Sequence, residues 1–150
     1  MLYRHSFTVQ APLSKVASFH AHSRSMGAIT PPPVIVRIHS SPGALSEGDE
    51  MAFTLWLLFL PIHWVARIQE VSPAGFTDVQ VRGPFAAWRH KHSYVQRDDQ
   101  FTEVQDEVEA ALSPNPVKWL IGAGMWLSMP VLFAFRGWKT KKLLQEPVRV

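Results

Sequence analysis

The sequence predicts an α+β domain in which a curved antiparallel sheet of about seven strands wraps around one long C-terminal helix, with two short helices after the first strand. Polar and apolar residues alternate over most of the chain between residues 34 and 112, which is typical of half-buried strands. Helical spacing of apolar residues is confined to a region after the first strand and to the apolar stretch after Pro116. A sheet of this length must bury one face, and only that stretch is large enough to cover it.

Proline and glycine divide the N-terminal half into short elements. In order, the chain predicts a strand over 2–10, helices over 12–20 and 23–28, and strands over 34–39, 50–59 and 62–71. Pro12 suits a first helical turn, and Val16 and Phe19 follow it at helical spacing. The segment 31–33 is three prolines, and it must be extended because proline has no backbone N–H to donate.

Residues 76–112 carry the most informative pattern. They alternate with breaks only at Gly83-Pro84 and Asp98-Asp99-Gln100, which predicts strands joined by two hairpins. Every second residue of a strand faces the same side, so the aromatic and histidine residues share one face and the cations share the other. The two sets are Trp88, His90, His92 and Tyr94 on one side, and Arg89, Lys91 and Arg97 on the other. The charged face must be solvent, so the histidines face the interior.

The two hairpin loops predict how these strands pair. A three-residue loop over 98–100 and a turn over 83–85 place an inward cluster of polar residues on three neighbouring strands. The predicted pairs are His92–Asp106, His90–Val108, Asp78–His90 and Gln80–Trp88. A register shift of one residue would bury the cations and is excluded by its cost. A shift of two residues would keep the cluster and change its partners.

The C-terminal stretch begins at a helix start signal, with Asn115 as N-cap and Pro116 at the first position. From Val117 to Phe135, Lys118 is the only charged residue, and Arg136, Lys139, Lys141 and Lys142 follow, which resembles a short membrane span with a basic flank. The alternative is a helix that covers the sheet, with Gly122 and Gly124 allowing a close approach and Pro130 causing a kink. The sheet otherwise has nothing to pack on.

Composition bounds the class of protein. The chain has 150 residues, of which 47% are hydrophobic, with 6 Trp, 9 Phe and no Cys. This predicts one globular domain over 1–150 without disulfides or zinc–thiolate sites, and fits a reducing cytoplasm. The net charge is +3 and the basic residues are scattered, which argues against a nucleic-acid partner. The N-terminus lacks the layout of a signal peptide, and no phosphate-binding glycine loop or nucleophile motif occurs.

The order of elements and a set of short motifs resemble the START-like superfamily of helix-grip proteins, also called SRPBCC or Bet v-like. The resemblance covers nearly the whole chain and is nearest to the polyketide cyclase/dehydrase and coenzyme-Q-binding branch. The motifs are Phe7-Thr8-Val9 with Ala11-Pro12, Val16, Phe19-His20, Leu45-Ser46-Glu47-Gly48-Asp49, Trp64-Val65-Ala66, Phe76-Thr77-Asp78-Val79-Gln80, Gly83-Pro84-Phe85, Trp88-Arg89-His90-Lys91-His92, Val104-Gln105-Asp106-Glu107-Val108 and Phe135-Arg136. The resemblance implies a ligand such as a lipid, sterol, polyketide, quinone or plant hormone between sheet and helix, and some members are cyclases or hydrolases.

The inward polar cluster allows three interpretations. The plainest is that His90, His92, Asp78 and Asp106 are buried polar groups that satisfy one another by hydrogen bonds. The second is contact with the polar head of a ligand. The third is chemistry: His90 or His92 as a general acid or base oriented by Asp106, or two histidines and a carboxylate as a metal site. We expect no metal, because an apolar wall offers no certain third ligand beyond the two aspartates, and we expect no cofactor.

The sequence therefore predicts binding of a hydrophobic small molecule between sheet and helix. The predicted ligand-binding residues are Trp64, Ala66, Asp78, Gln80, Trp88, His90, His92, Val108, Trp126, Met129 and Phe133. The alternatives are a cyclase- or dehydratase-type enzyme that uses His90 or His92 with Asp106, and a membrane-associated adaptor that uses the terminal helix. Peripheral membrane contact through the basic C-terminal end is compatible with each of them.

Overall fold

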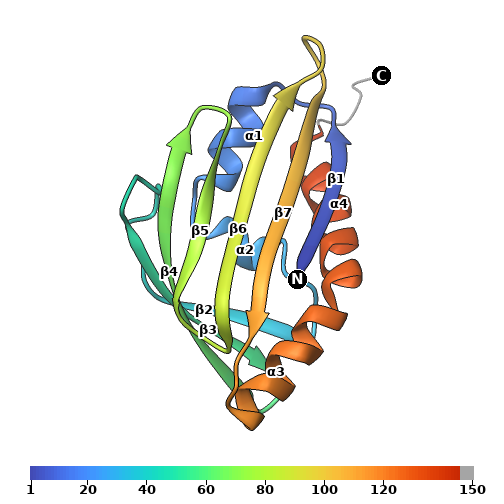
Figure 1. Ribbon diagram of the computed structural model, residues 1–150. Coiled ribbons are helices and arrows are strands. Elements are labelled where there is room, and N and C mark those ends of the chain that lie inside the picture. The colour runs from blue at the N-terminus through green and yellow to red at the C-terminus, as the bar shows by residue number, and fades with distance from the viewer. Residues whose placement is uncertain (146–150) are drawn as a thin grey trace.

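The computed structural model describes residues 1–145 as one curved sheet with helices against one side of it (Figure 1). The elements are β1 (Leu2–Val9), α1 (Leu13–His20), α2 (Ser25–Ala28), β2 (Val34–Ser40), β3 (Glu50–Leu57), β4 (Leu60–Ser72), β5 (Gly75–Arg82), β6 (Phe85–Gln96), β7 (Thr102–Leu112), α3 (Pro116–Leu127) and α4 (Met129–Leu144). The predicted fold class is confirmed, with its seven strands and its short helices after β1.

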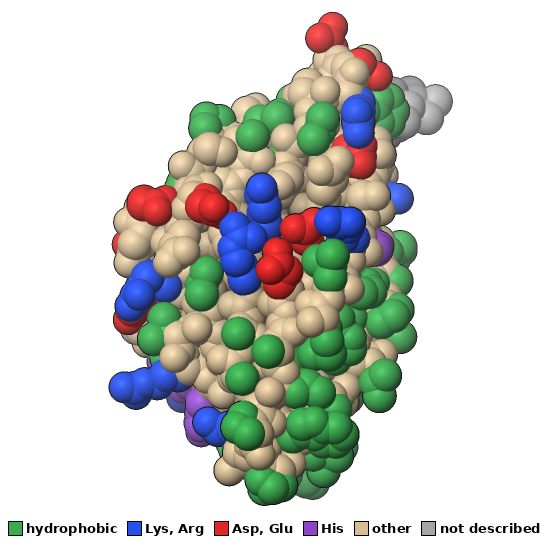
Figure 2. All heavy atoms as spheres, in the orientation of Figure 1, with side chains coloured by type: hydrophobic (Ala, Val, Ile, Leu, Met, Phe, Trp, Pro, Cys, Tyr) green, Lys and Arg blue, Asp and Glu red, His purple; other side chains and the backbone are tan. Residues whose placement is uncertain are grey.

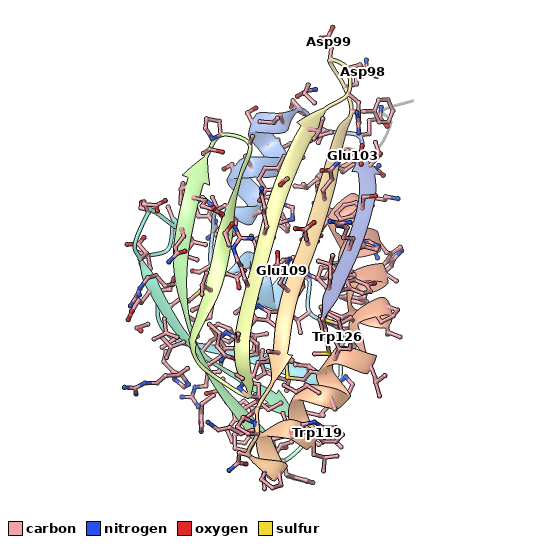
Figure 3. The ribbon with its side chains drawn as sticks, viewed as in Figure 1. Asp98, Asp99, Glu103, Glu109, Trp119 and Trp126 are labelled. Atoms are coloured by element: carbon pink, nitrogen blue, oxygen red, sulfur yellow. The ribbon has the colours of Figure 1, made fainter. Side chains whose placement is uncertain are left out.

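The strands form one antiparallel sheet in the order β1-β7-β6-β5-β4-β3-β2. The predicted register of the hairpins is confirmed for three pairs, His92–Asp106, His90–Val108 and Asp78–His90. The β5–β6 ladder ends at Val79–Arg89, one residue before the predicted Gln80–Trp88 pair. The Asp98-Asp99 loop lies at the tip of the β6–β7 hairpin (Figure 3).

The outer face of the sheet is the charged one, as the alternation predicts. Arg89 is paired with Glu70 and Arg4 with Glu107, each at 2.7 Å between nitrogen and oxygen. Figure 2 shows these opposite charges intermixed across the middle of that face. Because the charged side chains take the outer face, the alternate residues of β6 and β7 point into the core.

The predicted C-terminal helix is two helices that meet at an angle of 50°. Asn115 caps α3 as predicted, since its side-chain oxygen accepts hydrogen bonds from the N–H groups of Val117 and Lys118, both at 3.1 Å. The break falls at Ser128, two residues before Pro130, whose ring removes a backbone donor. Within residues 1–145, no single helix has the length and apolar character to cross a membrane, whereas α3 and α4 taken together meet both criteria.

Aromatic residues fill the space between the sheet and the helices. The core includes Trp64, Phe85 and Trp88 from the strands and Met129 and Phe133 from α4. Gly122 of α3 permits the predicted close approach, because a Cβ there would lie 3.2 Å from Leu112. Gly124 has no such neighbour within 4 Å. A second cluster lies where α1 packs on β6 and β7 and on the end of α4; it consists of Val9, Ala11, Val16, Tyr94, Val104 and Leu144.

The turn between β3 and β4 differs from the prediction. The apolar run of this segment predicts one strand to Phe59, but β3 ends at Leu57 and β4 begins at Leu60. Leu58 has a φ of 54°, a conformation that glycine and asparagine adopt far more readily than leucine. No turn residue marks this position in the sequence, so the tertiary pairing of the two strands decides it.

Candidate functional site

A cavity of about 650 Å³, hereafter the main cavity, lies between the inner face of the sheet and the C-terminal helices. Its wall comes from α2, the proline segment 31–33, strands β3 to β6, and α3 and α4. Most of the wall is apolar, with Phe53, Trp64 and Trp88 packed edge to face or stacked on one another. The curvature of the sheet keeps α4 away from β3 and β4, and the wall therefore encloses space that side chains do not fill.

The polar part of the site is a cluster of two histidines and two aspartates, hereafter the His–Asp cluster. His90 and His92 lie on β6, Asp78 on β5 and Asp106 on β7. His90 Nε2 lies 2.8 Å from Asp106 Oδ1, and His92 Nε2 lies 2.9 Å from Asp78 Oδ2. The residue spacing of two on β6 brings the imidazoles together, with ring centroids 3.8 Å apart and ring planes tilted by 35°.

Each remaining ring nitrogen of the cluster also faces a carboxylate. His90 Nδ1 is 3.5 Å from Asp78 Oδ2, and His92 Nδ1 is 3.3 Å from Asp106 Oδ1. The side chains of His90, His92 and Asp106 are at most 7% exposed, whereas that of Asp78 is 20% exposed. Asp78 is therefore the member of the cluster with the most room for a ligand.

Burial and hydrogen bonding displace the pKa values of the cluster in opposite directions. Burial alone would raise the pKa of Asp106, but hydrogen bonds from His90 and His92 hold it well below its usual value. Burial opposes the charged form of His92, yet hydrogen bonds to Asp106 and Asp78 raise its pKa. For His90, burial and the neighbouring charge of His92 prevail and lower the pKa. Of the two histidines, His92 is therefore the one whose imidazolium form the two carboxylates favour.

Comparison with known proteins shows what this architecture resembles. No protein-family model matches the chain, and no curated protein matches it in sequence. A START superfamily protein from Mycobacterium smegmatis matches with a TM-score of 0.64 at 11% identity, over 93% of this chain and 97% of that chain. An aromatase/cyclase from a Streptomyces species matches with a TM-score of 0.66 at 16% identity, over 95% of each chain. The chain has the START-like helix-grip fold.

A third similar structure is norcoclaurine synthase from Thalictrum flavum, in complex with dopamine and hydroxybenzaldehyde. It matches with a TM-score of 0.67 at 12% identity, over 95% of this chain and 85% of that chain. At these low identities the TM-scores establish the fold alone, and the function must be argued from the side chains of this chain.

The structure brings seven of the predicted ligand-binding residues together on the wall of the main cavity. They are Trp64, Ala66, Asp78, Trp88, His90, His92 and Met129. The alternation of β4 and β6 accounts for their shared face. Whether they touch a ligand stays a prediction.

The other four predicted residues lie off this wall. Gln80 is held at the β5–β6 turn, where its amide donates to the Phe85 carbonyl at 2.8 Å. Val108 and Phe133 are buried in the core, at 0% and 1% exposure. Trp126 packs edge to face on Tyr3, because the bend at Ser128 turns α3 away from the direction of α4. The helical spacing that placed Trp126 beside Met129 assumed a continuous helix.

Arg136 of α4 is a site residue that the sequence prediction missed. It lines the main cavity. Burial raises the pKa of Asp78, but the two histidines and, to a smaller extent, the charge of Arg136 lower it below its usual value. Its guanidinium lies 5.5 Å from the centre of the Phe133 ring, and within residues 1–145 it has no ion pair. In the sequence Arg136 stood out only as the start of the basic flank and in the Phe135-Arg136 motif of the resemblance, neither of which indicates that the helix turns its side chain toward the cavity.

The geometry of a metal site is partly present. Asp78, His90 and His92 offer ligand atoms that all lie within 4.8 Å of one another. Each of these residues, however, is already engaged in the carboxylate–imidazole contacts of the His–Asp cluster. Those contacts account for the arrangement without an ion, so the interpretation as a hydrogen-bonded cluster is the better supported one.

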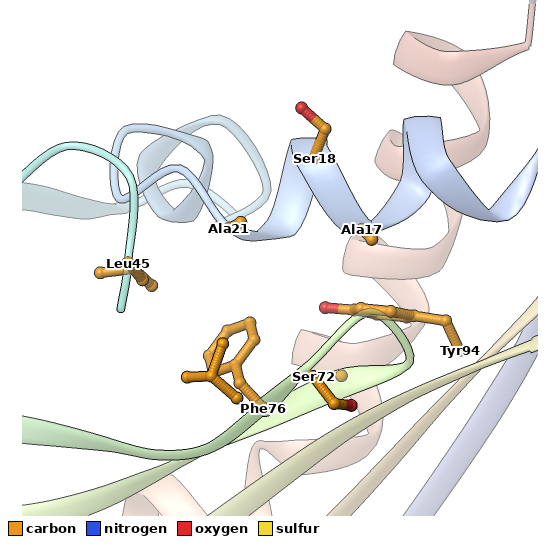
Figure 4. A pocket seen from close by; sticks show the side chains of 9 residues that line it. Ala17, Ser18, Ala21, Leu45, Ser72, Phe76 and Tyr94 are labelled. Carbon is orange, nitrogen blue, oxygen red and sulfur yellow. The ribbon is translucent and has the colours of Figure 1, made fainter. Parts of the chain in front are cut away.

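A smaller side cavity of about 200 Å³ lies between α1 and the β4–β5 turn (Figure 4). It shares Leu45 and Phe76 with the main cavity, and Phe76 stacks on His92 with ring centroids 4.4 Å apart. The buried hydroxyl of Tyr94 points into this space and has no hydrogen-bond partner within residues 1–145. Burial also raises the pKa of Tyr94, so the hydroxyl stays neutral.

Proposed function

We propose that the chain binds an amphipathic small molecule, with its apolar body in the main cavity and a hydroxyl-bearing end at Asp78. The observation that carries this proposal is the combination of an apolar cavity of about 650 Å³ with a compact polar cluster on its wall. That volume falls within the range of about 300–1,000 Å³ that small-molecule sites occupy. Lipids, quinols and polyketide-like phenols have the required chemistry.

The hydrogen-bond accounting of the His–Asp cluster favours a donor on the ligand. All four imidazole nitrogens lie within 3.5 Å of carboxylate oxygens. Asp78 Oδ1, by contrast, has no hydrogen-bond partner among residues 1–145. A ligand hydroxyl donating to Asp78 would satisfy this oxygen, while Arg136 supplies a cation for a second, electron-rich oxygen.

The similar structures support the class of ligand. One is named as an aromatase/cyclase, and another holds dopamine and hydroxybenzaldehyde, which are small phenols. The aromatic wall of the main cavity suits a ring compound of this size. The identity of the ligand is a matter for direct measurement.

The first test is native mass spectrometry of the purified protein, which should show a co-purified compound. The second is a matched pair of fluorescence-quenching titrations with naphthol and naphthalene. Asp78→Ala should weaken naphthol binding about threefold to tenfold and leave naphthalene binding nearly unchanged. Gln80→Ala, a change on the same strand but off the cavity wall, is the control. Equal losses for the two probes would mean that Asp78 acts through packing alone.

A cyclase- or dehydratase-type activity is the second candidate. The observation that favours it is a set of buried acid–base groups on a cavity wall whose pKa values are displaced in opposite directions. In such a reaction His90 or His92 would move a proton and Asp106 would orient the ring. Loss of turnover in His92→Ala with ligand binding intact would support the enzyme. Retained turnover in both His90→Ala and His92→Ala would rule out this mechanism.

A further inference from the structure

The mouth of the main cavity is surrounded by exposed apolar side chains, hereafter the apolar rim. The rim consists of the β3–β4 tip, Leu57–Leu60, with Leu120, Leu127 and Val131 from the C-terminal helices. Leu120 and Val131 line the main cavity and are nevertheless 68% and 69% exposed, so the cavity opens to the outside here. Figure 2 shows the hydrophobic surface gathered over α3 and along α4.

The β3–β4 tip is built in an unusual way for a hairpin. Its two loop residues are Leu58, which is 70% exposed, and Phe59, which is 97% exposed. Leu58 also adopts a φ of 54°, where a leucine is strained. Neither side chain packs on the protein in a way that would offset these costs. Leu57 and Leu60 of the tip line the main cavity together with Leu120 of α3, so the tip and the helix border the same cavity.

The C-terminal helices, which carry part of the apolar rim, have charges of one sign only. Residues 110–145 contain five Lys and Arg and no Asp or Glu. On the outward side of α4, Lys139 and Lys142 lie 5.9 and 5.2 Å from the centre of the exposed Trp138 ring. Tryptophan with flanking lysines is typical of segments at a membrane–water interface.

We propose that the apolar rim docks on an anionic membrane surface, with the cavity mouth facing the lipid. A bilayer accepts apolar side chains in its hydrocarbon and binds cations at its headgroups, which matches both properties of this surface. A second copy of the chain would instead set like charges against each other. Docking in this orientation lets an apolar ligand enter the cavity without crossing water. The docking surface does not depend on which ligand the cavity binds.

Vesicle flotation tests this proposal. The protein should float with vesicles made of equal parts phosphatidylcholine and phosphatidylglycerol, and less with phosphatidylcholine alone or at high salt. Phe59→Glu and Leu127→Glu should each reduce the bound fraction about tenfold, because each removes an exposed apolar anchor. Neither residue lines the main cavity. Val81→Glu, at an apolar position on β5 that is 43% exposed and lies outside the apolar rim, should bind as the unchanged protein does.

Quenching of tryptophan fluorescence by brominated lipids in the anionic vesicles gives a readout without any substitution. Quenching together with the flotation pattern above supports the docking surface. Failure of the unchanged protein to float or to be quenched would overturn it, and so would full binding by both variants. If the two variants instead dissociate a dimer in sedimentation velocity, the apolar rim is a contact between copies and the proposal is wrong. Naphthol binding without vesicles reports on the proposed function separately.

Discussion

The His–Asp cluster and the apolar rim both border the main cavity. Ionisable side chains are usually exposed and large apolar ones usually buried, and the two regions each do the opposite. The cluster buries His90, His92 and Asp106, whereas the rim exposes leucines and a phenylalanine. The two regions differ in whether the protein itself offsets the energetic cost of this placement. Every imidazole nitrogen of the cluster faces a carboxylate, so the cost of burial is offset within the protein. The side chains of the rim have no such partner within residues 1–145, and the proposed membrane contact would cover them from outside.

The largest expected effect comes from breaking the compensation of the His–Asp cluster. Asp106→Ala leaves two buried imidazoles without their shared acceptor and should lower the free energy of unfolding by about 3–5 kcal/mol. The control is Glu107→Ala, the next residue on the outward face, whose partner is Arg4 at the surface. That change should cost less than about 1 kcal/mol. Urea denaturation of both variants measures the two values, and equal losses would show that the cluster is not specially coupled.

The pH dependence of stability should show a maximum set by the two histidines. The pKa of His92 is raised, so its contribution is present below about pH 6.5 and is lost as the pH rises through the folded value. The pKa of His90 is lowered, so stability falls as the pH decreases below about 6.5, where the unfolded ring binds a proton first. His20, whose pKa burial lowers to about 4, acts in the same direction as His90.

Below about pH 4 the loss of stability with falling pH should become steeper, because two aspartates then begin to bind protons. The pKa values of Asp106 and Asp78 are lowered, so their contributions exist above about pH 3.9 and are lost as the pH falls through the folded values. Thermal unfolding between about pH 3 and pH 9 should therefore give a maximum near pH 6.5. His92→Gln should remove the decline on the alkaline side. A monotonic profile for the unchanged protein would contradict the assignment of the proton to His92.

A smaller change in stability is expected at the apolar rim. Leu58→Gly relieves a positive φ and should raise the free energy of unfolding by about 0.5–1 kcal/mol. The same change removes an exposed anchor and should reduce vesicle binding. A variant that is more stable but binds vesicles less would show that Leu58 serves membrane binding at the expense of stability. A loss of stability would mean that Leu58 packs in a way that favours the fold.

The two hairpins and the face of the His–Asp cluster could be predicted from the sequence. Strand alternation is local, and a short loop then aligns the next strand, so the sequence favoured His92 opposite Asp106, while a shift of two residues stayed open until the structure showed that pair. The cap at Asn115 and the kink near Pro130 are equally local, because they follow from backbone groups that lie within a few residues.

Which side chains meet across the cavity could not be predicted from the sequence, because it depends on how the helices pack on the sheet. Trp126 left the predicted wall and Arg136 joined the main cavity because the angle between α3 and α4 depends on packing against strands far away in the chain. The turn at Leu58 and Phe59 carries no turn residue and is imposed by the pairing of β3 with β4. Periodicity assigns a residue to a face, but the distance between two faces depends on how the helices cross the sheet, which no local pattern contains.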